Sequence, residues 1–132
     1  MALNTILRVG LFLFNEENPS TVLRPMEASG VSFLPRADSF EGALRLYPKM
    51  ITFGTHIAIL SLLDTAEEPI SLFETMKNDF SNRNYPIRTI AVYDGEQQID
   101  ESTAELFDKM VPWSKSCAPA LIAGCRELAE SV

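Results

Sequence analysis

The sequence predicts a single three-layer α/β domain, in which a doubly wound sheet of five parallel strands lies between two layers of helices. Short apolar runs alternate along the chain with longer segments whose apolar residues recur at helical spacing. This alternation indicates parallel strands joined by right-handed crossovers, which place helices on both faces of the sheet. The length of 132 residues, 46% of them apolar, suffices for one domain with one core and not for two. We therefore expect residues 1–132 to fold as one unit.

The chain begins with a strand and a helix. Residues 6–14 are almost continuously apolar, which is typical of a strand covered on both faces. A helix is expected over residues 19–29, because Pro19 suits the first helical position and Gly30 suits a helix end. Pro25 lies inside this segment and should kink the helix or delay its start.

A second strand, a second helix and a third strand follow. Residues 31–39 predict a short strand that leads into a loop. Apolar residues at helical spacing predict a helix over residues 40–46, and Pro48 closes that segment. Residues 56–63, "HIAILSLL", form the most apolar strand in the chain, and this composition suits the centre of the sheet.

The next two elements are a long helix and a strand. The helix is expected over residues 69–80 and is opened by Pro69. Its apolar positions, which recur at helical spacing, are Ile70, Leu72, Phe73, Met76 and Phe80. Residues 85–95 predict the fourth strand, which ends in a turn at Asp94-Gly95.

The last part of the chain predicts a strand between two helices. The polar residues 96–102 have room for little more than a short helix, and residues 105–113 contain a fifth, weaker strand. A final helix is expected over residues 117–130, with Ser116 as its N-cap and Pro119 in its first turn. Its inner face is formed by Leu121, Ile122, Cys125, Leu128 and Ala129.

The two cysteines, Cys117 and Cys125, are expected to be ordinary small residues of this last helix. Their separation of eight positions places their Cα atoms about 12 Å apart along the helix axis, which is too far for a disulfide. The spacing also matches neither a redox pair nor a zinc site. The alternative is an exposed, reactive thiol at Cys117.

The charge of the chain argues against a nucleic-acid partner. Acidic residues number 18 and basic residues 11, and no stretch gathers the basic residues into a stripe along a phosphate backbone. A secretory signal is not expected, because the N-terminal apolar run is short and Arg8 lies inside the candidate segment. No stretch approaches the roughly 18 apolar residues of a membrane span. We therefore expect a soluble, cytoplasmic protein that binds neither nucleic acid nor membranes.

Sheets of this kind hold their functional groups at the carboxyl ends of the strands. The first and third strands lead into "LFLFNEEN" and "HIAILSLLDTAEEP", in which Ser61 lies forty-five positions after Glu16. The fourth strand ends in "TIAVYDG" and the fifth in "VPW". In their spacing and in the kinds of residues that they contain, these segments resemble the CheY-like receiver domains of two-component response regulators. The resemblance covers nearly the whole chain, from Arg8 to about Glu130.

The resemblance implies a flavodoxin-like fold with strand order 2-1-3-4-5 and a phosphorylation site whose reactive groups are replaced. The family holds Mg²⁺ with an acidic pair, accepts phosphate on an aspartate, and places a Ser or Thr and a Lys at the last two strands. The matching positions are Asn15 and Glu16 for the acidic pair, Ser61 for the aspartate, Val92 or Tyr93 for the Ser or Thr, and Val111 for the Lys. Phosphoryl transfer needs an anionic nucleophile, a cation and a positive counter-charge. The chain therefore resembles a degenerate receiver, a pseudo-receiver.

This interpretation implies no catalytic residue and no cofactor, with at most weak Mg²⁺ affinity at Glu16. Ser61 is a poor nucleophile because the motif supplies no histidine close enough to activate it. The alternative is a receiver phosphorylated at Asp64, three positions further on, although that register leaves too little loop before Pro69.

The expected function is that of a non-enzymatic signalling module that works without phosphorylation. The resemblance implies a protein partner, or a second copy of the chain, on the family's 4-5-5 face, formed by its fourth helix, fifth strand and fifth helix. Tyr93 and Trp113 are the aromatic residues expected there, and ordinary packing against the last helix is the alternative. Two other functions stay open: a receiver-like domain that senses a small ligand in the altered strand-end pocket, or an enzyme of flavodoxin-like fold unrelated to receivers.

Two further features have simple interpretations. His56 opens the third strand on the side away from the expected site, which is typical of a surface histidine. The acidic residues near the strand ends are Glu16, Glu17, Asp64, Glu67 and Glu68. They form either an acidic patch that attracts a cation or a solvated loop.

Overall fold

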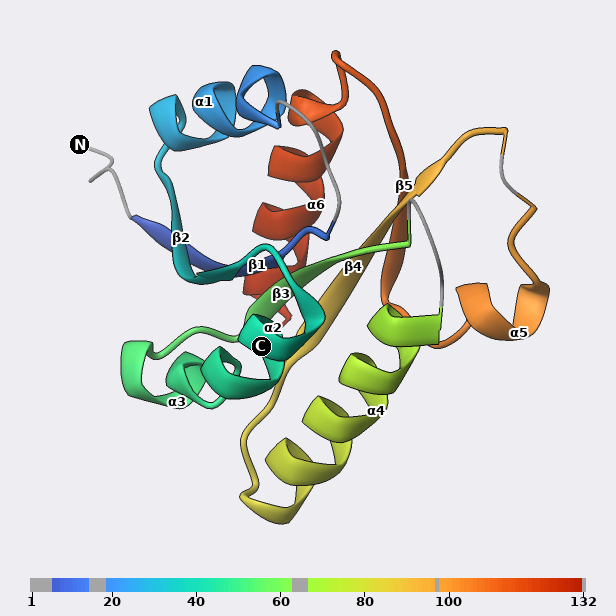
Figure 1. Cartoon of the computed structure of the whole chain (residues 1–132). Coiled ribbons are helices and arrows are strands. Elements are labelled where there is room, and N and C mark those ends of the chain that lie inside the picture. Colours follow the sequence, from blue (N-terminus) through green and yellow to red (C-terminus); the bar gives the residue numbers. More distant parts are fainter. Residues whose placement is uncertain (1–5, 15–18, 63–66, 97, 132) are drawn as a thin grey trace.

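The computed structural model describes residues 6–14, 19–62, 67–96 and 98–131 of the chain. Five parallel strands form one sheet in the order β2-β1-β3-β4-β5, with helices on both of its faces (Figure 1). The strands are β1 (Leu7–Phe12), β2 (Val31–Ala37), β3 (Ile57–Ser61), β4 (Arg88–Asp94) and β5 (Lys109–Trp113). The expected architecture and strand order are both confirmed.

The helices form the two outer layers. They are α1 (Ser20–Ala28), α2 (Phe40–Leu46), α3 (Lys49–Phe53), α4 (Glu67–Asn82), α5 (Glu101–Ala104) and α6 (Ala118–Glu130). One face of the sheet carries α1 and α6, and the other carries α2, α3 and α4 (Figure 1). The remaining helix, α5, is a single turn on the connection between β4 and β5.

The core consists of two apolar layers, one on each face of the sheet. Side chains alternate between the layers along each strand: Val9 and Leu11 of β1 pack in the α1–α6 layer, whereas Phe12 packs in the α2–α4 layer. All five residues of β3 are buried, because this strand is paired on both sides and covered on both faces. The apolar composition of β3 thus reflects its central place.

Helix α3 is absent from the sequence-based expectation. Helix α2 ends before Pro48, as expected, but Pro48 then takes the N-cap position of α3 with a φ of −62°. Proline begins a helix as readily as it ends one, because its φ is already helical and no N–H is needed there. Met50 is fully buried in the core, and Gly54 ends the helix at a φ of 66°, which favours glycine.

Helices α4 and α1 each contain a proline. Helix α4 begins at Glu67, two residues earlier than expected, so Pro69 lies in its first turn, where a missing N–H costs no hydrogen bond. Helix α1 continues through Pro25 to Ala28. Of the two effects expected of Pro25, a delayed helix start is therefore wrong, and a kink stays a prediction.

The predicted N-cap of the last helix is also wrong. Cys117, not Ser116, takes this position, and its side chain makes no capping hydrogen bond. The backbone N–H of Ser116 instead donates to the hydroxyl of Ser114 over 3.3 Å, so Ser116 belongs to the turn that precedes the helix.

Each edge strand of the sheet contains a proline. Strands β2 and β5 are each paired on one side only, and they contain Pro35 and Pro112 respectively. Because proline cannot donate to a ladder, edge strands are where a sheet tolerates it. The β1–β2 pairing is also irregular, with a shift of register between Val9 and Leu11.

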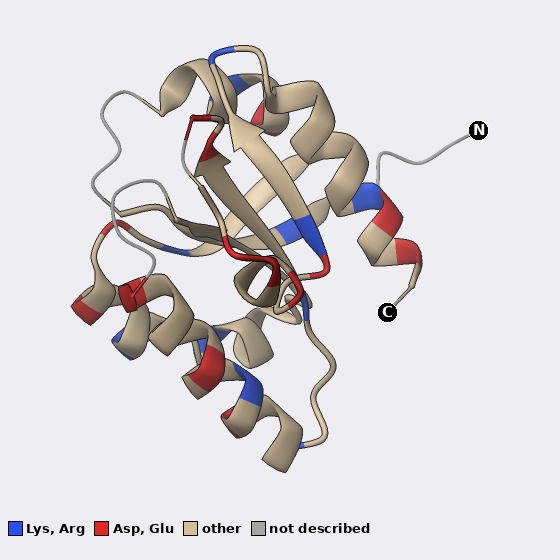
Figure 2. Ribbon diagram, turned by 90° about the vertical axis from the view of Figure 1, so that its right-hand side faces the viewer, with Lys and Arg blue, Asp and Glu red and all other residues tan. Residues whose placement is uncertain are grey.

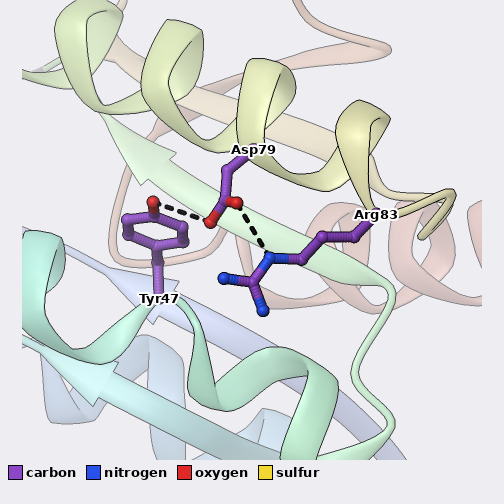
Figure 3. Close-up of polar contacts among 3 residues, drawn as sticks. All are labelled: Tyr47, Asp79 and Arg83. Atoms are coloured by element: carbon purple, nitrogen blue, oxygen red, sulfur yellow. Dashed lines mark hydrogen bonds and ion pairs between the residues drawn. The ribbon is translucent and has the colours of Figure 1, made fainter.

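A polar network joins α2 to α4 (Figure 3). The hydroxyl of Tyr47 donates to one carboxylate oxygen of Asp79 over 2.9 Å, and Nε of Arg83 donates to the other oxygen over 2.9 Å. The hydrogen bonds from Arg83 and Tyr47 lower the pKa of Asp79. A carboxyl whose pKa is lowered by folding contributes stability at neutral pH, and this contribution is lost as the pH falls through the folded-state pKa.

Candidate functional site

The register of β3, β4 and β5 brings together three of the expected site residues. Ser61 pairs with Val92, and Val92 pairs with Val111, so the three residues form one row across the sheet. Residues of one row point to the same face, and Val92 and Val111 pack in the α1–α6 layer. Ser61 is only 2% exposed. The three residues therefore form one enclosed cluster, which we call the strand-end row.

The register distinguishes the two candidates for the Ser or Thr position. Tyr93 pairs with Pro112, one row further on, and it packs on the α2–α4 layer. Val92 is thus the residue beside Ser61 in the sheet.

Tyr93 and Trp113 lie on opposite faces of the sheet. Both side chains are half-buried. Trp113 packs against the α1–α6 layer, whereas Tyr93 packs against the α2–α4 layer. The structure therefore does not bring the two aromatic rings together, although they flank the same end of the sheet.

The strand-end row has little capacity for phosphoryl chemistry. Its polar group is a neutral hydroxyl, and its other two side chains are hydrocarbon. Mg²⁺ prefers carboxylate oxygens and water, so these three residues do not fit the ion. Over the described ranges, no three His, Cys, Asp or Glu side chains are grouped to hold a metal.

Several predicted residues lie outside the described residues. These are Asn15, Glu16, Glu17 and Asp64. The weak Mg²⁺ affinity at Glu16 and the alternative acceptor Asp64 therefore stay predictions. The same holds for a ligand pocket at the strand ends, since the loops after β1 and β3 would form part of it.

The two acidic residues at the start of α4 have a structural role. Glu67 and Glu68 are exposed and occupy its first turn. Negative charge at a helix N-terminus is stabilised by the helix dipole. The expected acidic patch also includes Glu16, Glu17 and Asp64, which lie outside the described residues, so the cation that it would attract stays a prediction.

An apolar patch near α5 was not expected from the sequence. Four half-buried apolar residues of β4, β5 and their connection pack against the α2–α4 layer, namely Tyr93, Ile99, Leu106 and Met110. Helix α5, which lies on the same connection, has only four residues. We call this group the β4–β5 patch. The shortness of the polar segment 96–102 is the signal in the sequence that points to it.

The two cysteines are free and buried, so the predicted absence of a disulfide is confirmed. Burial raises the pKa of the Cys125 thiol to about 12. Cys117 is 5% exposed, which contradicts the alternative of an exposed thiol at this position. Both residues serve as small apolar groups in the α1–α6 layer.

His56 lies at the amino end of β3, opposite the strand-end row. Its Nδ1 is 2.8 Å from the carbonyl oxygen of Pro86, and its ring stacks on Tyr85 with centroids 4.5 Å apart. The prediction that His56 lies away from the expected site is confirmed.

Charged residues are dispersed over the described part of the molecule. Figure 2 shows Lys and Arg positions scattered among the helices and strands, with acidic residues between them. In the same described ranges, no helix has both the length and the apolar character needed to cross a bilayer.

Comparison with solved structures shows the CheY-like receiver fold. The response regulator protein TrrA from Thermotoga maritima, in complex with Mg²⁺-BeF, has a TM-score of 0.68 and 15% identity, covering 92% of this chain and 98% of that chain. A mutant of the receiver domain of the histidine kinase CKI1 from Arabidopsis thaliana has a TM-score of 0.71 and 16% identity, covering 97% and 92%.

The fold is shared with proteins of another kind. A cobalamin-binding protein from Desulfitobacterium hafniense has a TM-score of 0.63 and 15% identity, covering 92% of this chain and 58% of that chain. Neither a protein-family model nor a characterised protein sequence matches the chain. Because fold does not imply function, the function has to be argued from the residues.

Proposed function

We propose that this chain is a pseudo-receiver: a non-enzymatic signalling module that acts by protein–protein interaction and without phosphorylation. The observation that carries the proposal is the strand-end row. The register of β3, β4 and β5 places the hydroxyl of Ser61 in one row with the hydrocarbon side chains of Val92 and Val111. The resemblance to receivers implies an aspartate, a Ser or Thr, and a Lys at these three positions.

The chemistry of the row supports this proposal. A phosphate acceptor has to be nucleophilic and reachable, but Ser61 is a neutral alcohol that is 2% exposed. A phosphoryl group there would meet Val92 and Val111, which carry no charge to balance it.

The proposal predicts that phosphate donors leave the protein unchanged. Incubation with acetyl phosphate and Mg²⁺ should give no mass shift, and beryllofluoride with Mg²⁺ should not alter the fluorescence of Trp113. Trp113 is the only tryptophan in the chain and packs beside the row, so its emission reports directly on this end of the sheet.

Two variants identify the acceptor if a mass shift is seen. A shift that Asp64→Asn abolishes and Ser61→Ala preserves would establish the alternative receiver phosphorylated at Asp64. A shift that only Ser61→Ala abolishes would show that the row itself is reactive. Either result would refute the pseudo-receiver.

The contact surface of the module is proposed to surround the edge strand β5. Since α2 and α3 both lie between β2 and β3, the family's fourth and fifth helices correspond here to α5 and α6. The β4–β5 patch lies on one face of β5, and Trp113 lies on the other. Half-exposed aromatic and methionine side chains are typical of protein interfaces.

Sedimentation equilibrium tests this surface for self-association. If the partner is a second copy, Met110→Glu should raise the dimer dissociation constant about tenfold, equivalent to about 1.4 kcal/mol, by placing a charge in the patch. The control Thr75→Glu introduces the same charge at an exposed position of α4 and should leave the constant unchanged. A chain that sediments as a monomer at all concentrations would exclude self-association and require a different protein partner.

A further inference from the structure

A concave site lies at the amino ends of β1 and β3, at the opposite end of β3 from Ser61. It is a pocket of about 470 Å³ between the start of β1, the turn before β3 and the end of α6. Its lining includes Ile6, Arg8, Gly54, His56, Ile57 and Ala129. Along β3, the four residue steps from Ile57 to Ser61 correspond to about 13 Å. The pocket is therefore separate from the proposed pseudo-receiver site.

The pocket carries positive charge in an acidic protein. Its ionisable lining residues are Arg8 and His56, and none of the described residues that line it is acidic. The whole chain has a formal net charge of −7. A positively charged lining in a protein of negative net charge favours an anionic ligand over a cationic one.

The guanidinium of Arg8 is held in place by the backbone. Its Nη1 donates to the carbonyl oxygen of Phe53 over 2.6 Å, at the end of α3. Gly54 follows at a φ of 66°, and a Cβ atom added there would lie 4.0 Å from the same Nη1. Gly54 therefore lies directly beside the guanidinium.

The imidazole of His56 is also fixed. A carbonyl oxygen can only accept, so the 2.8 Å contact with Pro86 requires a proton on Nδ1. The ring stacks on Tyr85 at an interplanar angle of 15°, and the Tyr85 hydroxyl donates to the carbonyl of Thr55 over 2.7 Å. One wall of the pocket is thus a flat, supported ring.

We propose that this pocket binds a small carboxylate with an apolar body. The volume lies within the roughly 300–1,000 Å³ of small-molecule sites. Arg8 pairs with the carboxylate, because a guanidinium presents several N–H donors to one anion. Ile6 and Ala129 contact the apolar body, and the ring of His56 closes one side.

Benzoate is the probe, and His56 is the reporter. His56 is the only histidine in the chain, so its ring resonances in a proton NMR spectrum need no further assignment. Titration with benzoate should shift these resonances in a saturable way. Benzamide, which has the same shape without the charge, should bind at least fivefold more weakly.

Two arginine variants test the ion pair. Arg8→Gln should weaken benzoate binding about fivefold, the effect expected from losing a partly exposed ion pair worth about 1 kcal/mol. Arg24→Gln removes the same charge from an exposed position of α1 and should leave the affinity unchanged. Because the comparison of benzoate with benzamide uses the unaltered protein, the test holds even if Arg8→Gln folds poorly.

Three results would overturn the proposal. They are the absence of a saturable shift of His56, equal affinity for benzoate and benzamide, and equal weakening by the two arginine variants. The last would indicate a general charge effect and no specific pair.

Discussion

Replacing Ser61 by aspartate should lower the free energy of unfolding by about 3 kcal/mol at pH 8, because it buries a charge in a row whose other two side chains are hydrocarbon. Ser61 is 2% exposed, and its neighbours in the strand-end row are Val92 and Val111. Burial of this kind raises the pKa of the new carboxyl above its unfolded value. The penalty is therefore present above the raised pKa and is lost as the pH falls and the group becomes protonated. At pH 4 the decrease in the free energy of unfolding should be less than half of the decrease at pH 8.

A second substitution in the same row should restore part of the lost stability. Val111 lies two strands from Ser61, and neighbouring strands are about 4.8 Å apart, so a lysine side chain can span the distance. Urea denaturation of Ser61→Asp, of Ser61→Asp with Val111→Lys, and of the control Ser61→Ala measures each effect. The control Ser61→Ala should lower the free energy of unfolding by about 1 kcal/mol. If Ser61→Asp is as stable as the unaltered protein at pH 8, the row is not enclosed, and the argument against phosphorylation at this strand end fails.

Replacing Phe80 by alanine should lower the free energy of unfolding by about 3–5 kcal/mol, as expected for removing a large aromatic side chain from a closely packed core. Phe80 is fully buried near the end of α4. Its ring contacts Tyr47 edge-on, with centroids 5.6 Å apart, and Tyr85 at 5.4 Å. The substitution therefore removes two aromatic pairs as well as apolar contact.

The matched control is Asn78→Ala, two residues earlier on the same helix and exposed. It should change the free energy of unfolding by no more than about 0.5 kcal/mol. Thermal and urea denaturation of both variants checks the difference. A loss below about 1 kcal/mol for Phe80→Ala would mean that the end of α4 does not pack against Tyr47 and Tyr85 as described.

The sheet could be predicted because its strands carry their own signals. The strand β3 is an apolar run whose five residues are all buried, so composition alone indicates its central place. Helix α3 could not be predicted in this way. It has five residues, which is too short for a helical period to be recognised, and the proline before it reads equally well as an end or a beginning.

The site could be predicted only in part. Spacing along the chain indicates the strand to which a residue belongs, and the structure places Ser61 at the end of β3 and Val111 within β5. Spacing alone did not identify whether Val92 or Tyr93 lies in the row of Ser61, because adjacent residues of a strand differ only in the face to which they point. The register between β3 and β4 decides this point. The pocket of Arg8 and His56 gives no signal in sequence at all, since its residues come from segments far apart in the chain.

The prolines of the two edge strands affect how the protein can aggregate. An unpaired strand edge is a template on which another chain can add, and fibrils grow by repeating this step. Both open edges of this sheet are interrupted, because Pro35 in β2 and Pro112 in β5 cannot donate a backbone hydrogen bond. Neither end of the sheet offers an incoming strand an unbroken row of donors, so growth of a continuous sheet from molecule to molecule is disfavoured at both ends.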